Sequence, residues 1–183
     1  MKYALTALLA TCLCLPLMGD DAAKKKFEET KAKAEKGDAK AQGLLAWEYA
    51  YGEKKDPVLA FEWAKKAAEQ GDSKGEFILG RSFHRGLGTE QDSKEAVKWY
   101  RKAAEQGLAG AQYNLGVMYG SGDGVLQDYV NSYAWTDIAG ANGHDIKKFK
   151  SEFLKKKMTP EQIAKAQELS KEMIKKNPKL INE

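Results

Sequence analysis

The chain has 183 residues, enough for one ordinary domain, with a formal net charge of +4 and 43% hydrophobic residues. Together with a charged fraction of 31%, this composition excludes both a disordered tail and a membrane-embedded bundle. Only four prolines occur, and alanine, lysine and glutamate are abundant, so the composition favours helix.

Residues 1–19 are predicted to be a signal peptide. Lys2 precedes a sixteen-residue apolar run at 3–18, and the small residue Gly19 is followed by the polar stretch DDAAKKK. This pattern is typical of a cleaved secretory signal, so we expect an exported protein, periplasmic or secreted. The alternatives are a retained signal anchor and a lipoprotein modified at Cys12. Cys12 and Cys14 both lie in this segment, so the mature chain would contain no cysteine and no disulfide.

A ten-residue stretch occurs twice, as EWAKKAAEQG at 62–71 and KWYRKAAEQG at 98–107. The glycines that end these stretches, and a third one further on, are spaced 36 residues apart: Gly71, Gly107 and Gly143. Three tryptophans have the same spacing: Trp63, Trp99 and Trp135. A fixed period of this length indicates stacked units that bury a common core, since one unit cannot bury its apolar face alone.

Each unit is predicted to be a pair of helices. In the third unit, Ala111, Leu115, Gly116 and Tyr119 lie at i, i+4, i+5 and i+8, which is one face of a helix. A glycine-rich turn follows, and an aspartate then stands where the second helix begins, which is the preferred N-cap chemistry. The repeated stretch is the end of this second helix.

The organisation expected from these patterns has six parts. Phe27 stands 34 residues before Phe61, so 26–37 resembles a second helix without its partner. The stretch TPEQ at 159–162 predicts a capped helix that covers the last unit. The parts are a signal peptide at 1–19, a capping half-repeat helix at 20–37, repeats at 38–71, 72–107 and 108–143, and capping helices with a basic tail at 144–183.

The charge is distributed unevenly along the chain. Residues 20–146 contain 18 basic and 21 acidic residues, whereas 147–183 contain 11 lysines and 5 glutamates. The basic tail is either an ordinary solvated face or a weak contact with an anionic surface. It contains no arginine, so a nucleic-acid partner is not expected.

The repeats resemble Sel-one-like repeats, which are related to tetratricopeptide repeats. The resemblance covers about 37–143 and is carried by AQYNLGVMYGSGDGVLQD at 111–128 and by the tryptophan-containing helices that end in AAEQG; 158–172 also resembles a terminal segment of bacterial members. It implies an all-α, right-handed solenoid of antiparallel helix pairs that acts as a non-catalytic adaptor or scaffold. The alternative function is that of a cell-envelope polymer binder or hydrolase, as in a secreted cysteine-rich branch, but this chain lacks the paired cysteines of that branch.

In such a solenoid the first helix of each unit lines the concave face, and positions that differ between units are candidates for binding. Trp47, Arg81 and Val117 share one repeat position, and Tyr51, Arg85 and Ser121 share another. Aromatic residues and arginines are enriched in binding hot spots. The candidate partner-binding residues are Trp47, Tyr51, Phe77, Arg81, His84, Arg85 and Tyr113. The alternative is that the aromatic residues are structural and the arginines are solvated.

No motif in the sequence predicts an enzyme, a cofactor or a metal site. The only histidines, His84 and His144, lie 60 residues apart. The glycine-rich stretches precede no phosphate-loop lysine and follow helices rather than strands. We therefore expect a protein or peptide partner and no catalytic residues.

Overall fold

The computed structural model describes residues 18–181, without the side chains of 18–21 and 152–155. The predicted signal peptide therefore lies almost entirely outside the described residues. The helices are α1 (Met18–Glu35), α2 (Ala39–Tyr51), α3 (Pro57–Glu69), α4 (Ser73–Arg85), α5 (Ser93–Glu105), α6 (Ala109–Ser121), α7 (Tyr129–Ala141), the π-helix η1 (Phe149–Leu154), α8 (Lys155–Lys157), α9 (Pro160–Lys176) and the 3₁₀ helix η2 (Pro178–Leu180).

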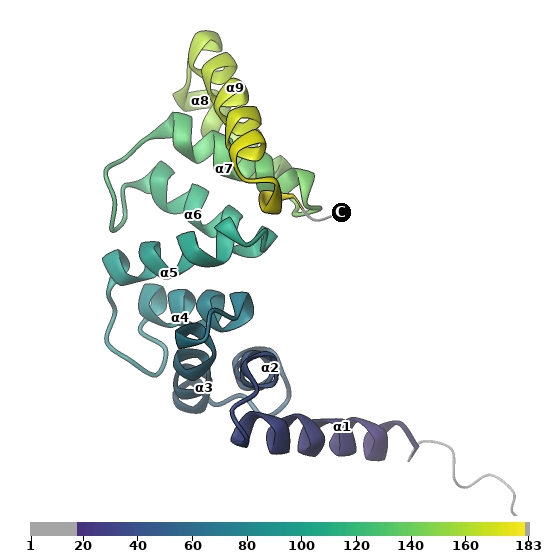
Figure 1. Cartoon of the computed structure of the whole chain (residues 1–183). Coiled ribbons are helices and arrows are strands. Elements are labelled where there is room, and N and C mark those ends of the chain that lie inside the picture. The colour runs from purple at the N-terminus through teal and green to yellow at the C-terminus, as the bar shows by residue number, and fades with distance from the viewer. Residues whose placement is uncertain (1–17, 182–183) are drawn as a thin grey trace, which may run out of the picture.

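The helices stack in chain order from α1 at one end to α9 at the other (Figure 1). Three antiparallel pairs form the repeats, namely α2 with α3, α4 with α5, and α6 with α7, and we call them units one, two and three. Over the described residues 18–181 the chain contains no strand. The predicted all-α solenoid of helix pairs is confirmed.

Aspartates set the starts of the second helices. The carboxylates of Asp56, Asp92 and Asp128 accept hydrogen bonds from backbone N–H groups in the first turns of α3, α5 and α7. An N-cap side chain of this kind satisfies donors that the helix leaves unpaired, and contributes about 1 kcal/mol. The first helices begin at Asp38 and Asp72 in the same way, whereas α6 begins at Leu108, which has no capping side chain.

The long turns of units two and three each need a glycine for a close backbone approach. Gly88 and Gly124 both have positive φ, of 74° and 70°. A Cβ on Gly88 would lie 2.2 Å from the Pro57 carbonyl oxygen, and one on Gly124 would lie 2.2 Å from the Ser93 carbonyl oxygen. Each turn therefore lies on the start of the second helix in the preceding unit, and these turns project on the left in Figure 1.

Helix α1 packs like the second helix of a repeat, and within the part of the chain that the structure describes no first helix precedes it. Phe27 meets Tyr49 edge-on with ring centroids 6.0 Å apart, and Phe61 meets Phe83 in the same geometry at 5.6 Å. Both residues of the first pair stand 34 positions before those of the second. Helix α1 therefore packs on α2 as α3 packs on α4.

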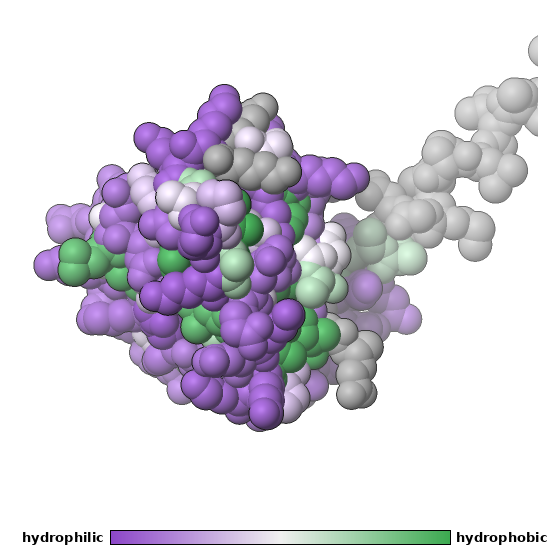
Figure 2. Space-filling view, turned by 90° about the horizontal axis from the view of Figure 1, so that it is seen from above, coloured by the Kyte–Doolittle hydropathy of each residue, from purple (hydrophilic) through white to green (hydrophobic). Residues whose placement is uncertain are grey.

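Helix α9 covers unit three by packing on α7. Thr159 and Gln162 form the predicted capping box, and Tyr133, Met158 and Ala166 make a small core beneath the helix. Figure 2 looks down on this end of the molecule, where hydrophilic residues predominate. Within the segment predicted to hold the capping helices, the chain forms the π-helix η1 from Phe149 onward.

The chain then returns along the stack to unit two. Leu180 is buried in the main core, and its backbone carbonyl accepts hydrogen bonds from the Gln112 and Asn142 side chains at 2.8 and 2.6 Å. The Asn177 side-chain amide donates to the Glu105 carbonyl at 2.9 Å. Among residues 18–181, no helix is both long and apolar enough to cross a membrane.

Candidate functional site

The predicted partner-binding residues come from α2, α4 and α6, and most of them line one hollow. This hollow, of about 420 Å³, is the α4–α6 hollow throughout. Its lining consists of Tyr51, Phe77, Arg81, His84, Arg85, Tyr100, Tyr113, Asn114 and Val117. Of the seven predicted residues only Trp47 lies outside the lining, and it stacks on Phe77 with ring centroids 5.9 Å apart.

The hollow exists because the first helices are not evenly spaced. Helix α2 packs directly on α4, but α4 and α6 approach each other far less closely. Tyr113 on α6 does not fill the gap, because its ring stacks on His144 at 4.5 Å and meets the edge of Phe149 at 5.7 Å. Tyr113 is thereby held at the far wall of the hollow.

Aromatic rings make the near wall and the floor. Trp47 and Tyr51 are 39% and 38% exposed, and their ring centroids lie 4.6 Å apart. Phe77 is only 7% exposed, since it is packed between Trp47 and Tyr100. Phe77 therefore supports the wall, while Trp47 and Tyr51 present their rings to solvent.

Two arginines give the hollow its charge. The Arg81 guanidinium lies over the Tyr51 ring, 4.5 Å from its centroid, which is a cation–π contact. Arg85 stands one turn further along α4 and is exposed. Within the described part of the chain, no carboxylate lies within 4.0 Å of either guanidinium. Both arginines can therefore pair with an anionic group from outside.

His84 joins α4 to the long turn of unit three. Its Nε2 lies 3.3 Å from Oδ2 of Asp123, and its ring meets the edge of Tyr100. This contact fixes the rim of the hollow.

The tyrosine hydroxyls remain neutral at ordinary pH. Burial raises the pKa of Tyr51, although the nearby positive charges of Arg81 and Arg85 oppose the shift. Burial also raises the pKa of Tyr100, by more. Since both phenols keep their protons, each can donate a hydrogen bond to a ligand oxygen.

Sequence reasoning missed three lining residues, Tyr100, Asn114 and Val117. Tyr100 lies on α5, a second helix, and forms the floor, whereas all seven predicted residues lie on first helices. A signal was present: the same repeat position holds Ala64 in unit one and Thr136 in unit three. The bulky residue in unit two was visible as a departure from the repeat.

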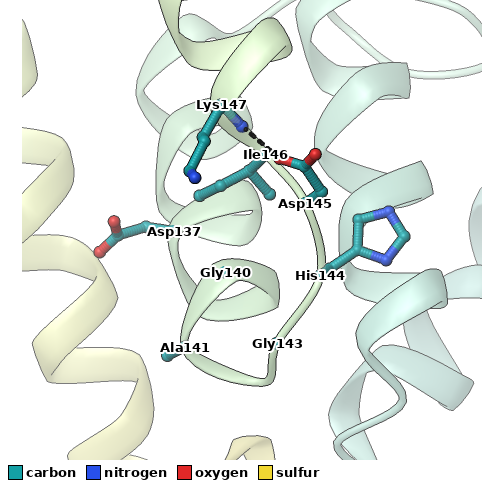
Figure 3. A pocket seen from close by; sticks show the side chains of 8 residues that line it. All are labelled: Asp137, Gly140, Ala141, Gly143, His144, Asp145, Ile146 and Lys147. Atoms are coloured by element: carbon teal, nitrogen blue, oxygen red, sulfur yellow. Dashed lines mark hydrogen bonds between the residues drawn. The ribbon is translucent and has the colours of Figure 1, made fainter.

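A second hollow, of about 610 Å³, lies where α7 meets the C-terminal cap, and two of its polar side chains, those of Asp137 and His144, contact residues outside its lining. In Figure 3 Asp137 and His144 point away from each other, toward different helices. Asp137 binds the Lys150 ammonium and accepts a hydrogen bond from the Ser170 hydroxyl at 3.0 Å. Burial lowers the pKa of His144, which stacks on Tyr113. The arrangement is structural.

Nothing in the described residues suggests a bound ion. No group of three or more histidine, cysteine, aspartate or glutamate side chains is placed to hold a metal within 18–181. Every buried side-chain nitrogen and oxygen described there has a hydrogen-bond partner.

Comparison with known families gives one clear match. The model of the Sel1 repeat matches three consecutive segments, 39–72, 73–108 and 109–144, which together cover more than half of the chain. Each segment contains one helix pair and follows the predicted repeat boundaries within one or two residues. Among curated proteins, none matches this chain.

Two solved structures are similar in fold and sequence. One is c5321, a protective antigen present in uropathogenic Escherichia coli strains and displaying an SLR fold; it is 38% identical, with a TM-score of 0.74 over 86% of this chain. This chain spans 34% of the length of that protein. The other is a Sel1 repeat protein from Oxalobacter formigenes, 32% identical, with a TM-score of 0.57 over 75% of this chain and 98% of that one.

Proposed function

Because the chain belongs to the Sel1 repeat family, whose helical scaffold is typical of protein–protein interaction, we propose that it is an adaptor that binds a protein or peptide segment in the α4–α6 hollow. The observation that carries the proposal is the hollow itself. It combines exposed aromatic rings with two arginines that no described carboxylate neutralises. Members of this family are generally non-catalytic scaffolds, which agrees with a binding role for the hollow.

The chemistry of the hollow fits an acidic segment. Arginine forms two parallel hydrogen bonds to a carboxylate, and the neutral hydroxyls of Tyr51 and Tyr100 can donate to the same oxygens. Aromatic rings supply contact area at a low cost in conformational entropy. The alternative ligand, a cell-envelope polymer, stays a prediction.

The expected location belongs to the same proposal. The apolar run at 3–18 with its polar flanks supports export, and the capping helices add several exposed lysines, including Lys156, Lys157 and Lys175, for weak contact with an anionic surface. Fractionation of cells that express the tagged chain would test the first statement. Retention on anionic vesicles that falls as salt rises would test the second.

The binding proposal is tested by selecting peptides on the purified protein. A library of random displayed dodecapeptides is panned on the wild type, and the selected peptides are then titrated into three proteins. These are the wild type, Arg81→Ala/Arg85→Ala, and a control, Lys65→Ala/Lys74→Ala, which removes the same charge from exposed positions outside the hollow.

We expect the selected peptides to be acidic and to bind the arginine variant about 30-fold more weakly, since losing charged contacts costs about 2 kcal/mol or more. The lysine control should bind as the wild type does. Equal binding to all three proteins would show that the hollow is not the site.

A further inference from the structure

An apolar groove lies between α1 and α2, at the end of the stack opposite α9. It has a volume of about 300 Å³ and is lined by Ala23, Lys26, Phe27, Thr30, Leu44, Leu45, Trp47 and Glu48. Leu44 is 43% exposed and Trp47 39% exposed, although both are large apolar residues. None of the sequence patterns predicted this groove.

The groove is open at this end of the stack because, among residues 18–181, no first helix precedes α1. Leu44 occupies the same repeat position as Ile78, which lies 34 residues later. Ile78 is 1% exposed, because α2 packs against α4. Among the described residues, no earlier first helix covers α2 in the same way. Leu44 is therefore a core position that has remained at the surface.

The groove and the α4–α6 hollow meet at Trp47. Trp47 belongs to the lining of the groove and also contacts Tyr51 and Phe77, which line the hollow. The guanidinium of Arg81 lies over the Tyr51 ring. A chain of contacts therefore runs from the apolar groove, where Leu44 lies, to the cationic hollow.

We infer that a single extended peptide occupies both sites, with a large apolar side chain in the α1–α2 groove and an acidic side chain on Arg81 and Arg85. The inference rests on the proposed function and adds a second subsite to it. The charges of the two sites favour this occupant. The groove is lined by one cation, Lys26, and one anion, Glu48, so it favours an uncharged side chain. The hollow is lined by Arg81 and Arg85, which have no carboxylate within 4.0 Å among the described residues.

The geometry also predicts the spacing of the two anchors. Seven residues of helix separate Leu44 from Tyr51, which is about 10 Å along α2. The Arg81 guanidinium, which binds the acidic side chain, lies another 4.5 Å from the Tyr51 ring centroid. Because an extended peptide advances about 3.3 Å per residue, the apolar and the acidic residue of the ligand should be about three to four positions apart.

The inference is tested with synthetic peptides of fixed composition, titrated by nuclear magnetic resonance into the full-length protein labelled with ¹⁵N. The reference peptide is acetyl-Gly-Leu-Gly-Gly-Glu-Glu-Gly-amide, in which leucine and the first glutamate are three positions apart. One comparison peptide has alanine in place of leucine, and another has both glutamates replaced by glutamine. The backbone signals of Leu44 and Arg81 report on the two subsites separately.

Each peptide is also titrated into Leu44→Ser and into a matched control, Leu126→Ser, since Leu126 is a largely exposed leucine on the distant long turn of unit three. We expect the leucine-to-alanine change in the peptide to weaken binding to the wild type and to Leu126→Ser about tenfold, as burial of a leucine side chain predicts. The same change in the peptide should leave its affinity for Leu44→Ser unchanged, because that variant has already lost the apolar side chain that would contact the peptide leucine.

The outcomes separate this inference from the proposed function. Two results would overturn the second subsite and leave the adaptor proposal standing. In one, binding needs the glutamates but does not change when the peptide leucine becomes alanine. In the other, the leucine-to-alanine change weakens binding to Leu44→Ser by the same factor as binding to the wild type. Binding that is indifferent to the glutamates, or the absence of binding by every peptide, would overturn both.

Discussion

Units two and three have the same backbone and different surfaces. Both contain a first helix with a glycine at its centre, Gly80 or Gly116, and both close with an aspartate-capped second helix. Where unit two has arginines at 81 and 85, unit three has Val117 and Ser121. The comparison teaches that the repeated residues determine the fold, whereas the residues that depart from the repeat create the hollow and its charge.

Unit two also differs from units one and three in the residue at one buried polar position. Gln42 in unit one and Gln112 in unit three each donate a hydrogen bond to the backbone carbonyl eight residues earlier, at 3.0 and 3.2 Å. Unit two has Glu76 at this position. A carboxylate cannot donate, and Glu76 instead accepts a hydrogen bond from the Gln106 amide at 2.8 Å. Unit two therefore carries a buried acid where its neighbours carry amides.

The largest expected effect on stability comes from the C-terminal tail, which contacts both unit two and unit three. Gly107 is buried beneath the returning chain, whereas its counterpart Gly71 is exposed. We expect Leu180→Ala to lower the free energy of unfolding by about 3 kcal/mol, because it removes a side chain buried at 3% exposure. Urea denaturation measures this. Leu126→Ala is the control and should change little; an equally small change in Leu180→Ala would mean that the tail does not stabilise the stack.

A smaller difference is expected between the two central glycines. An added Cβ on Gly116 would lie 2.6 Å from the Thr136 methyl and 3.0 Å from the backbone oxygen of Ser132, whereas one on Gly80 would meet the Tyr100 ring at 2.9 Å. A ring can shift more easily than backbone. We expect Gly116→Ala to destabilise by about 2 kcal/mol and Gly80→Ala by about 1 kcal/mol. The opposite order in urea denaturation would contradict this view of helix packing in unit three.

The last expected effect on stability depends on pH and disappears in acid. Burial raises the pKa of Glu76 to about 6 from its usual value of 4.5, although the Gln106 hydrogen bond and Lys102 lower it, and Asp72 and Glu105 add to the increase. Because the folded state holds this proton more tightly than the unfolded state, Glu76 penalises folding above pH 6, and the penalty disappears as the pH falls through 6 toward 4.5.

We therefore expect Glu76→Gln to stabilise the protein by about 1–2 kcal/mol at pH 7.5 and by almost nothing at pH 4.5. Unfolding curves at several pH values measure the difference. The reverse change in unit three, Gln112→Glu, should destabilise at pH 7.5, since it ends two donations to backbone carbonyls. A constant effect of Glu76→Gln across this pH range would mean that Glu76 does not titrate in it.

The repeat architecture could be predicted from the sequence because it depends on local and periodic signals. The 36-residue spacing of the glycines, the aspartate N-caps and the Thr159 capping box are all visible within short windows, and the helix pairs follow from them. The half-repeat α1 was predicted from the position of Phe27 alone.

The features that escaped prediction depend on contacts between distant residues. Leu180 and Gln112 are 68 positions apart, and nothing in the local sequence indicates that they meet. Tyr113, on the far wall of the hollow, packs against His144, which lies 31 positions later in the chain. The exposure of Leu44 follows from the absence of a covering helix, whereas its own sequence pattern is that of a core residue.

The most direct test of the central claim is to give unit two the surface residues of unit three. In Arg81→Val/Arg85→Ser, each arginine is replaced by its counterpart from unit three, and far-ultraviolet circular dichroism should remain that of the wild type. We expect calorimetric titration with a peptide selected on the wild type to show affinity reduced about 30-fold or more. Wild-type affinity in this variant would contradict the claim that the departures from the repeat in unit two form the binding site.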